Sequence, residues 1–210
     1  MLVIGAKGFA KEVLEILIQN GEDENLCFYD DINIYNHPKL YNRFPILQSL
    51  SEAERFFDKA SNKFIIGIGN PILRKEMFEK FSNIGGTPVT IISKNAEIGS
   101  IGTNIGVGSI IMAGVKVSND TEIGRGSIIY YNSVITHDVK IGEFCEISPS
   151  VNVLGGATIG NKCHLATASI IFPNIHVGND AIIAAGSVVN KDVPPNTMVA
   201  GTPAVIKKRI

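Results

Sequence analysis

The sequence predicts two folds in series: a small α/β domain over residues 1–90 and an all-β parallel β-helix over residues 91–210. Apolar runs that alternate with amphipathic helical patterns predict the first domain. Aliphatic residues at every sixth position predict the second, because no helix keeps one face buried at a strict period of six. Glycines at every eighteenth position indicate that three hexads complete one coil.

The first domain is expected to alternate strands with helices. The expected strands are the apolar runs Leu2–Ala6, Leu26–Tyr29, Phe64–Ile68 and Val89–Ile92. The expected helices are Gly8–Gln19, Glu52–Asp58 after an N-cap at Ser51, and Leu73–Phe81 with Pro71 in its first turn. This β-α-β order predicts a small, Rossmann-like parallel sheet.

The hexads of the second domain run without a miss or an insertion. Their aliphatic residues are Ile105, Ile111, Val117, Ile123, Ile129, Ile135, Ile141, Ile147, Val153, Ile159, Leu165, Ile171, Val177, Ile183 and Val189. Glycine follows the aliphatic residue once per three hexads, at Gly106, Gly124, Gly142, Gly160 and Gly178. We expect these glycines to stack at one corner of a three-sided prism and to adopt backbone angles that other residues resist. Residues n and n + 18 then become neighbours.

Composition excludes several classes of function. The chain has 19 Lys plus Arg against 20 Asp plus Glu, so it carries no basic field for nucleic acid or an anionic membrane. Its first residues show neither a basic n-region nor a long apolar stretch, so we expect a cytoplasmic protein without membrane insertion. Three cysteines are too few for a disulfide framework, and their spacing fits no zinc motif.

One constellation in the hexads is typical of acyl transfer. His137 and Asp138 follow Ile135, and Gly155-Gly156 stand one coil away at the same place. An imidazole there can accept a proton from an amine or hydroxyl, and a bare backbone amide beside it can hold an oxyanion. Asp138 can fix the tautomer of His137. The alternative interpretation is a solvated surface histidine.

The turn Gly5–Phe9 lies between the first expected strand and helix, where backbone amides can face an anionic or polar ligand. Its spacing is G-x-x-G, which differs from the dinucleotide fingerprint G-x-G-x-x-G. Asp30, at the end of the second expected strand, can bind a ribose hydroxyl. The alternative is a plain tight turn followed by a capping aspartate.

Four segments carry a resemblance to a known family: Gly5–Ala10, Ile68–Asn70 with Arg74, Thr136–Gly142 and Val199–Ala204. In this order they resemble the hexapeptide-repeat sugar-nucleotide acetyltransferases. These include the bacillosamine-pathway enzymes that N-acetylate UDP-linked 4-amino sugars and the sialic acid O-acetyltransferases. The likeness spans essentially the whole chain and implies a left-handed prism. The hexads alone do not give the hand, because parallel crossovers are ordinarily right-handed.

The resemblance implies an acetyl-CoA-dependent N-acetyltransferase that acts on a nucleotide-linked 4-amino sugar for bacterial polysaccharide or glycan synthesis, without a metal. His137 would be the general base, Asp138 its partner and Gly155 the amide donor to the thioester carbonyl. The implied acetyl-CoA contacts are Glu146, Thr167 and Ala185. The implied sugar-nucleotide contacts are Lys7, Gly8, Phe9, Asp30, Asp31, Gly69 and Asn70. The family forms homotrimers with sites between neighbouring prisms.

The sequence departs from the family at one cofactor contact. Many relatives carry a second histidine nine residues after the first, where this chain has Glu146. One hypothesis is that His164, one coil away, supplies the imidazole instead. The alternative is that His164 forms an ordinary surface ion pair with Glu146.

Other functions remain as alternatives. A hydroxyl acceptor, as in sialic acid O-acetylation, needs a base in the same place. A metal-dependent lyase of the carbonic-anhydrase type needs three converging histidines, whereas His137, His164 and His176 fall on different faces. A nicotinamide oxidoreductase leaves the hexads unexplained, and a purely structural prism makes the His-Asp and Gly-Gly pattern a coincidence. The basic end, Lys207–Arg209, either contacts a CoA phosphate or is an exposed tail.

Overall fold

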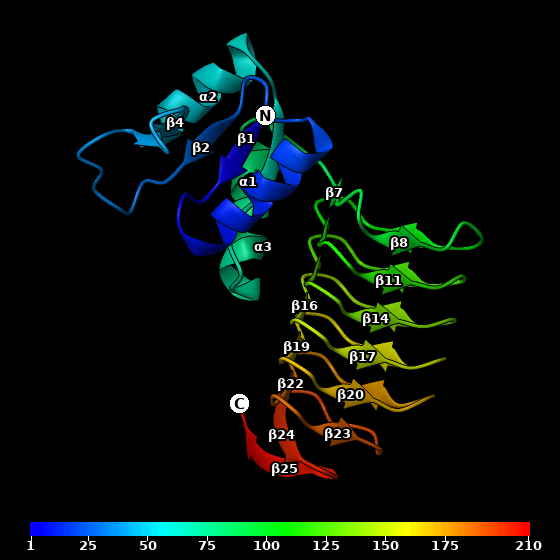
Figure 1. Ribbon diagram of the computed structural model, residues 1–210. Helices are drawn as coiled ribbons and strands as arrows, with labels where there is room; N and C mark the ends of the chain where they lie inside the picture. The colour runs from blue at the N-terminus through cyan, green and yellow to red at the C-terminus, as the bar shows by residue number, and fades with distance from the viewer. The chain divides into compact units, whose positions relative to one another are not determined.

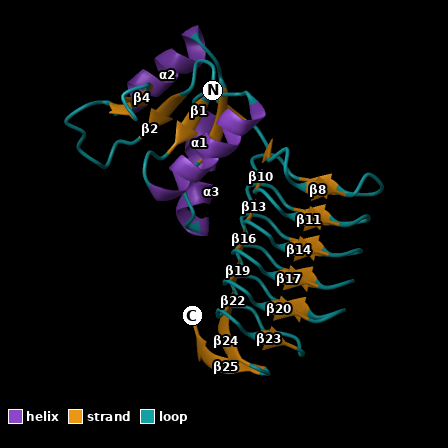
Figure 2. Ribbon diagram, viewed as in Figure 1, coloured by secondary structure: helices purple, strands orange, loops and turns teal.

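The computed structural model describes all 210 residues, which form two compact units, Met1–Ile91 and Ile92–Ile210. The first unit contains all three helices, and the second consists of short strands joined by turns (Figures 1 and 2). No helix is both long and apolar enough to cross a membrane.

The first unit contains a six-stranded, mainly parallel sheet with the order β3-β4-β2-β1-β5-β6. Its strands are β1 (Leu2–Ile4), β2 (Cys27–Tyr29), β3 (Lys39–Leu40), β4 (Phe44–Leu47), β5 (Lys63–Ile66) and β6 (Thr87–Pro88). Its helices are α1 (Gly8–Asn20), α2 (Leu50–Lys59) and α3 (Pro71–Asn83). The prediction of a small parallel α/β fold is confirmed.

An aromatic cluster forms the core on one face of this sheet. Phe57 of α2 and Phe78 and Phe81 of α3 lie with ring centroids 6.0–6.2 Å from that of Phe64 in β5. The α2 and α3 helices therefore cover the same face. The connection from β1 to β2 crosses the sheet in one direction, and the connections from β4 to β5 and from β5 to β6 cross it in the other. Right-handed crossovers therefore place α1 on the face opposite to α2 and α3.

Local details of this unit differ from the prediction. The last strand of the sheet is β6 (Thr87–Pro88) rather than Val89–Ile92, and Ile91–Ile92 pairs instead in a sheet of the second unit. The N-cap of α2 is Ser49 rather than Ser51, and it forms a capping box with Glu52 that starts the helix two residues earlier. The hairpin of β3 and β4 was not predicted. Its strands are two and four residues long, and Pro45 interrupts the apolar pattern of β4.

The second unit is a left-handed parallel β-helix with three sheets, as predicted. One sheet contains β7 (Ile91–Ile92), β10 (Ile110–Ile111), β13 (Ile128–Ile129), β16 (Glu146–Ile147), β19 (His164–Leu165), β22 (Ile182–Ile183), β24 (Thr197–Gly201) and β25 (Ala204–Arg209). The next contains β8 (Glu97–Ile98), β11 (Lys116–Val117), β14 (Val134–Ile135), β17 (Asn152–Val153), β20 (Ile170–Ile171) and β23 (Val188–Val189). The third contains β9 (Asn104–Ile105), β12 (Glu122–Ile123), β15 (Lys140–Ile141), β18 (Thr158–Ile159) and β21 (His176–Val177).

The register along the prism is 18 residues per coil. Ile135 pairs with Val153, and Val153 pairs with Ile171. The aliphatic residues of these strands are buried and fill the prism. The prediction that residues n and n + 18 are neighbours is confirmed.

The reason for the periodic glycines differs from the predicted one. The left-handed backbone angle of each turn lies three residues after the aliphatic residue, for example at Asp138 (φ 61°), and not at the glycine that directly follows it. The glycines are required because successive coils approach closely there. A Cβ on Gly124 would lie 2.5 Å from the carbonyl carbon of Gly142.

Candidate active site

Every coil has three corners, and His137 lies at the corner between β14 and β15. The chain turns there because Asp138 adopts the left-handed conformation. Val139 then returns to the buried interior, so His137 and Asp138 project outward. The turn that closes each hexad therefore sets the direction of both side chains.

His137 and Asp138 form a hydrogen-bonded pair. The Nδ1 atom of His137 lies 2.7 Å from Oδ2 of Asp138, and the two side chains are 70% and 64% exposed. A carboxylate only accepts hydrogen bonds, so Nδ1 carries the proton and donates to Asp138. The lone pair of Nε2 is then directed away from Asp138 and is available to a substrate.

Gly155 lies directly over the imidazole of His137, one coil further along the prism. A Cβ at this position would lie 2.6 Å from Cε1 and 2.8 Å from Nε2 of His137. The backbone angle of Gly155 is an ordinary one, so the close approach of the ring is what requires glycine here. The structure therefore brings together His137, Asp138 and Gly155, the three residues predicted for catalysis.

The amide of Gly155 forms no hydrogen bond within the chain. At the same hexad place on another corner, the amides of Glu143 and Asn161 each donate to the asparagine side chain of the next coil, at 2.8 Å. The residue one coil beyond Gly155 is Pro173, whose side chain cannot accept a hydrogen bond. The Gly155 N–H is therefore an open donor beside a base.

Two of the residues predicted for acetyl-CoA lie at a different corner. Thr167 and Ala185 are exposed, follow β19 and β22, and stand one above the other. The amide of Gly186 donates to the carbonyl of Thr167 at 2.9 Å, which fixes this stacking. Within one chain, the structure does not bring Thr167 and Ala185 together with His137.

Glu146 and His164 are paired residues of β16 and β19. His164 Nε2 lies 3.9 Å from the Glu146 carboxylate and 3.2 Å from the Ser148 hydroxyl. Both side chains belong to the same sheet, and His164 stands one coil beyond Glu146. A role for either residue in binding acetyl-CoA stays a prediction.

The histidines of the prism do not converge. His137 lies at a corner, whereas His164 and His176 lie in strands of two different sheets. No group of three or more histidine, cysteine or acidic side chains is arranged to hold a metal ion.

The first unit contains a cleft of about 430 Å³ at the carboxyl ends of β1, β2 and β5. The chain leaves β1 toward β2 on one side and later returns to β5 on the other, so this is the switch point where such sheets bind ligands. Six of the residues predicted for the sugar nucleotide line it: Lys7, Gly8, Phe9, Asp30, Asp31 and Gly69.

The amino terminus of α1 opens into this cleft without a side-chain cap. Its N-cap residue is Lys7, whose side chain cannot accept a hydrogen bond, and its first turn contains no acidic residue. The other two helices are capped, α2 by Ser49 and α3 by Asn70. The partial positive charge of the α1 terminus and the Lys7 ammonium both favour an anionic ligand here.

Asp30 organises the wall of the cleft. Its carboxylate accepts hydrogen bonds from Tyr35 (2.5 Å), from the Asn33 side chain and amide, and from the Ile32 amide. Burial by itself would raise the pKa of Asp30, but the hydrogen bonds from Tyr35 and Asn33 outweigh it and hold the pKa below its ordinary value. Asp31, which contacts Tyr29 and Lys80, is the carboxylate with remaining capacity to bind a ligand.

Asn70 and Arg74 hold the loop that forms another wall. The side chain of Asn70 accepts hydrogen bonds from the amides of Ile72 and Leu73 at 3.0 Å, and Asn70 does not line the cleft. The guanidinium of Arg74 is fully buried and donates to the carbonyls of Ile68 (3.2 Å) and Gly69. A buried cation thus fixes the backbone that faces the ligand.

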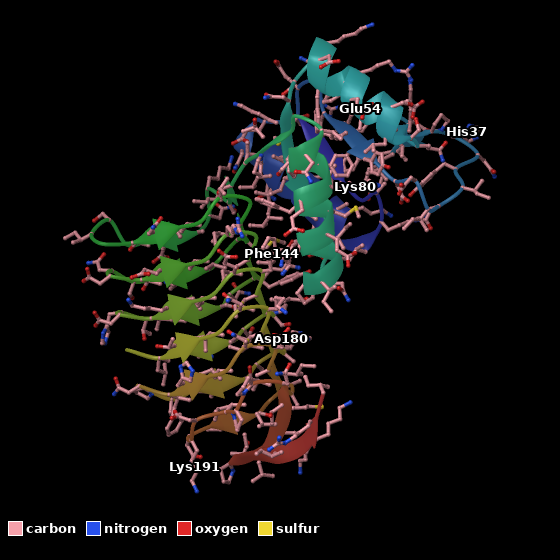
Figure 3. The ribbon with its side chains drawn as sticks, turned by 180° about the vertical axis from the view of Figure 1, so that it is seen from behind. His37, Glu54, Lys80, Phe144, Asp180 and Lys191 are labelled. Carbon is pink, nitrogen blue, oxygen red and sulfur yellow. The ribbon has the colours of Figure 1, made fainter.

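Sequence reasoning missed one face of α3. Leu73, Met77 and Lys80 line the cleft, and Lys80 pairs with Asp31 at 3.5 Å. Figure 3 shows Lys80 on this helix. Leu73, Met77 and Lys80 are four and three residues apart, which is the spacing of residues on one face of a helix. This spacing is the signal that could have identified them.

Replacing Gly155 by alanine is expected to displace the His137 ring, because the new Cβ would lie within 2.8 Å of two of its atoms. The hydrogen bond to Asp138 should lengthen, while the melting temperature should change little because both side chains are exposed. A crystal structure or histidine NMR resonances would show this. Gly186→Ala is a control for backbone strain without a clash, since Gly186 has a left-handed φ of 66° but a Cβ there meets no atom within 4 Å, and it should leave the His137 ring in place. An unmoved imidazole in Gly155→Ala would contradict the prediction.

Comparison with known proteins finds matches for both units of the chain. The family model described as the PglD N-terminal domain matches residues 1–81. No curated protein sequence matches the chain.

Solved structures match nearly the whole chain. A variant of perosamine N-acetyltransferase from Caulobacter crescentus, in complex with CoA and GDP-perosamine, is 27% identical, with 99% of this chain and 96% of that chain covered and a TM-score of 0.90. The acetyltransferase domain of PglB from Neisseria gonorrhoeae, in complex with acetyl coenzyme A, is 26% identical, with 98% of each chain covered and a TM-score of 0.88. WeeI from Acinetobacter baumannii is 25% identical, with 98% of each chain covered and a TM-score of 0.74.

The family model and the solved structures agree on the kind of protein that this chain resembles. The family model accounts for the α/β unit, and the acetyltransferase structures account for that unit together with the prism. The chain is similar in both units to the hexapeptide-repeat sugar acetyltransferases.

Proposed function

We propose that this protein transfers the acetyl group of acetyl-CoA to the amino group of a nucleotide-linked 4-amino sugar. The observation that carries the proposal is the open amide of Gly155, which lies directly over the imidazole of His137. The structural relatives described as bound to CoA, acetyl-CoA or GDP-perosamine support the choice of donor and acceptor.

The proton is handled by His137. Its Nε2 accepts a proton from the sugar amine as the nitrogen attacks the thioester carbonyl, and Asp138 stabilises the resulting imidazolium through Nδ1–H. A carbon–nitrogen bond forms, the carbon–sulfur bond then breaks, and His137 returns the proton to the departing CoA thiolate. Because the amine attacks the thioester directly, the mechanism has no covalent enzyme intermediate and needs no hydroxyl or thiol nucleophile beside His137.

The developing negative charge is stabilised by the backbone. When the amine attacks, the thioester oxygen becomes an oxyanion, and the Gly155 N–H donates a hydrogen bond to it. The donor is fixed by the ladder bond from Gly156 N–H to the His137 carbonyl (3.1 Å), so it needs no reorganisation during the reaction. The same bond sets its position relative to the base.

The sugar nucleotide is held by the cleft of the first unit. Its diphosphate would meet the uncapped amino terminus of α1 and the ammonium groups of Lys7 and Lys80. Asp31 would accept hydrogen bonds from sugar or base groups. Asp30 and Asn70 would act indirectly, by shaping the loops around them.

A homotrimer would complete the donor site. His137 and Gly155 lie at one corner of the prism, and Thr167 and Ala185 lie at another. One acetyl-CoA can contact both sets only if these corners come from neighbouring prisms in a closed ring. The cytoplasmic location stays a prediction from the sequence.

His137→Ala is expected to lower kcat by about 100- to 10,000-fold, the usual loss when a general base is removed. Release of the CoA thiol from acetyl-CoA, with a nucleotide-linked 4-amino sugar as acceptor, measures this. His176→Ala is a matched control, because His176 is exposed in a strand of another sheet. Unchanged turnover of His137→Ala would reject His137 as the base, and acetylation of a sialic acid hydroxyl in preference to the amine would reject the acceptor.

Arg74→Lys is expected to raise KM for the sugar nucleotide about 10-fold, because loss of one hydrogen bond from a charged group costs about 1.5 kcal/mol. The KM for acetyl-CoA should not change, since Arg74 lies in the first unit and donates to the carbonyls of Ile68 and Gly69 in the loop of its cleft. Steady-state kinetics with each substrate varied in turn would show the split. Arg55→Lys on the exposed surface of α2 is the control. Equal changes in both KM values would contradict the positioning role.

The purified protein is expected to sediment with the mass of three chains at micromolar concentration. Sedimentation velocity, with enzyme activity measured across a dilution series, tests the assembly. A fully active monomer would contradict a donor site shared between prisms.

A further inference from the structure

Tyr35 lies outside the cleft of the first unit but contacts two residues that line it. It belongs to the loop between β2 and β3. Its hydroxyl donates a hydrogen bond to the Asp30 carboxylate at 2.5 Å, and its ring centroid lies 4.7 Å from Nζ of Lys7. Lys7 and Asp30 line the cleft, whereas Tyr35 does not. Tyr35 is therefore placed to act on a ligand through these two neighbours.

The hydroxyl of Tyr35 anchors its ring to a rigid group. Asp30 is 8% exposed, and its carboxylate also accepts hydrogen bonds from the Ile32 amide and from Asn33. Burial and the hydrogen bond to Asp30 raise the pKa of Tyr35, so the hydroxyl keeps its proton and remains the donor. One end of the ring is thus fixed, and Lys7 lies over its face.

The ammonium of Lys7 has a ring as its partner and no carboxylate. Lys7 is exposed and forms no ion pair, whereas the other cation of the cleft, Lys80, lies 3.5 Å from the Asp31 carboxylate. A carboxylate neutralises an ammonium group, but an aromatic face attracts it through its quadrupole and supplies no net negative charge. The full charge of Lys7 therefore stays available to an anionic ligand.

Holding this ammonium in place favours binding. A lysine side chain loses rotamer freedom when it contacts a ligand, and a side chain that is already restrained has less freedom to lose. Lys7 is the N-cap residue of α1, whose first turn has amide groups without a side-chain cap. The restrained ammonium and the amino terminus of the helix thus present positive charge at one place.

A second contact of the same kind lies away from the cleft. Nζ of Lys11, one turn further along α1, lies 5.7 Å from the ring centroid of Tyr41. Neither Lys11 nor Tyr41 lines the cleft. The chain therefore contains a matched pair of contacts, of which only one includes a residue of the cleft.

We propose that Tyr35 is a positioning residue for Lys7: its ring, anchored on Asp30, holds the Lys7 ammonium at the amino terminus of α1, where it contacts the diphosphate of the sugar nucleotide. This inference rests on the proposed binding of a sugar nucleotide in the cleft. Tyr35 sets the affinity for the acceptor substrate and takes no part in acetyl transfer.

Paired substitutions isolate the ring. Tyr35→Phe and Tyr35→Leu both lose the hydroxyl, and only Tyr35→Leu also loses the aromatic face. We expect Tyr35→Leu to raise the Kd of UDP or GDP, whichever the wild type binds, about two- to five-fold above that of Tyr35→Phe, which is the range of an exposed cation–π contact. Calorimetric titration measures this. With the corresponding nucleoside, uridine or guanosine, which lacks phosphate, NMR titration should give equal affinities.

A double-mutant cycle with Lys7→Met links the ring to the ammonium. In that background Tyr35→Phe and Tyr35→Leu should bind the nucleoside diphosphate equally. In enzyme assays, Tyr35→Leu should raise KM for the sugar nucleotide and leave kcat and the KM for acetyl-CoA unchanged. Tyr41→Leu is the matched control, since it removes the ring over Lys11 and should leave the Kd unchanged.

Equal Kd values for Tyr35→Phe and Tyr35→Leu in the chain that retains Lys7 would overturn the positioning role. It would also be overturned by a difference between them that persists in Lys7→Met, or that appears equally with the nucleoside. A wild-type protein that binds neither UDP nor GDP would instead reject the proposed nucleotide cleft, which is a different result from a wild type that binds one of them.

Discussion

The ladder of backbone hydrogen bonds between successive coils is the constraint on which the second unit depends. It pairs residue n with residue n + 18, so a position in the sequence fixes both the face and the height of a side chain. The imidazole of His137 lies under Gly155 because of this register and not because of any attraction between them. A single inserted residue between the two would carry one of them off the corner, even though the aliphatic interior could still be filled.

The same ladder explains why the proposed catalytic residues lie at a corner of the prism. Within the strands, the amide groups are used by the neighbouring coil. At the corners, the amide two residues after the aliphatic residue has no ladder partner, and asparagine side chains satisfy it at Glu143 and Asn161. At Gly155 the corresponding residue of the next coil is Pro173, and the donor stays open. Other corner amides, such as those of Thr167 and Ala185, are also open, and the amide of Gly155 differs from them because it lies beside the imidazole of His137, where the proposed oxyanion would form.

The prism could be predicted almost completely from the sequence because its contacts repeat. The neighbours of His137 followed from counting. The reason for the periodic glycines was wrong, since coil spacing and not backbone angle requires them, and the antiparallel pair β24–β25, which lies outside the repeat, was not predicted. The first unit was predicted less well. Its fold follows from alternating strands and helices, but the hydrogen bonds of Asp30 with Tyr35 and of Arg74 with the Gly69 carbonyl depend on loop conformations that no period encodes.

This contrast bears on how substrate choice and catalysis can be separated in one chain. The proposed base, its carboxylate partner and the proposed amide donor are held by a register that tolerates no insertion, whereas the cleft is formed by loops at the ends of β1, β2 and β5. Loops accept changes in length and side chain at small cost, because they lie outside the ladders. The proposed acceptor site can therefore be altered through residues 29–35 and 67–70 without changing the register that holds His137. The cost falls on the buried groups, Asp30 and Arg74, whose hydrogen bonds fix those loops and which a new acceptor would have to leave in place.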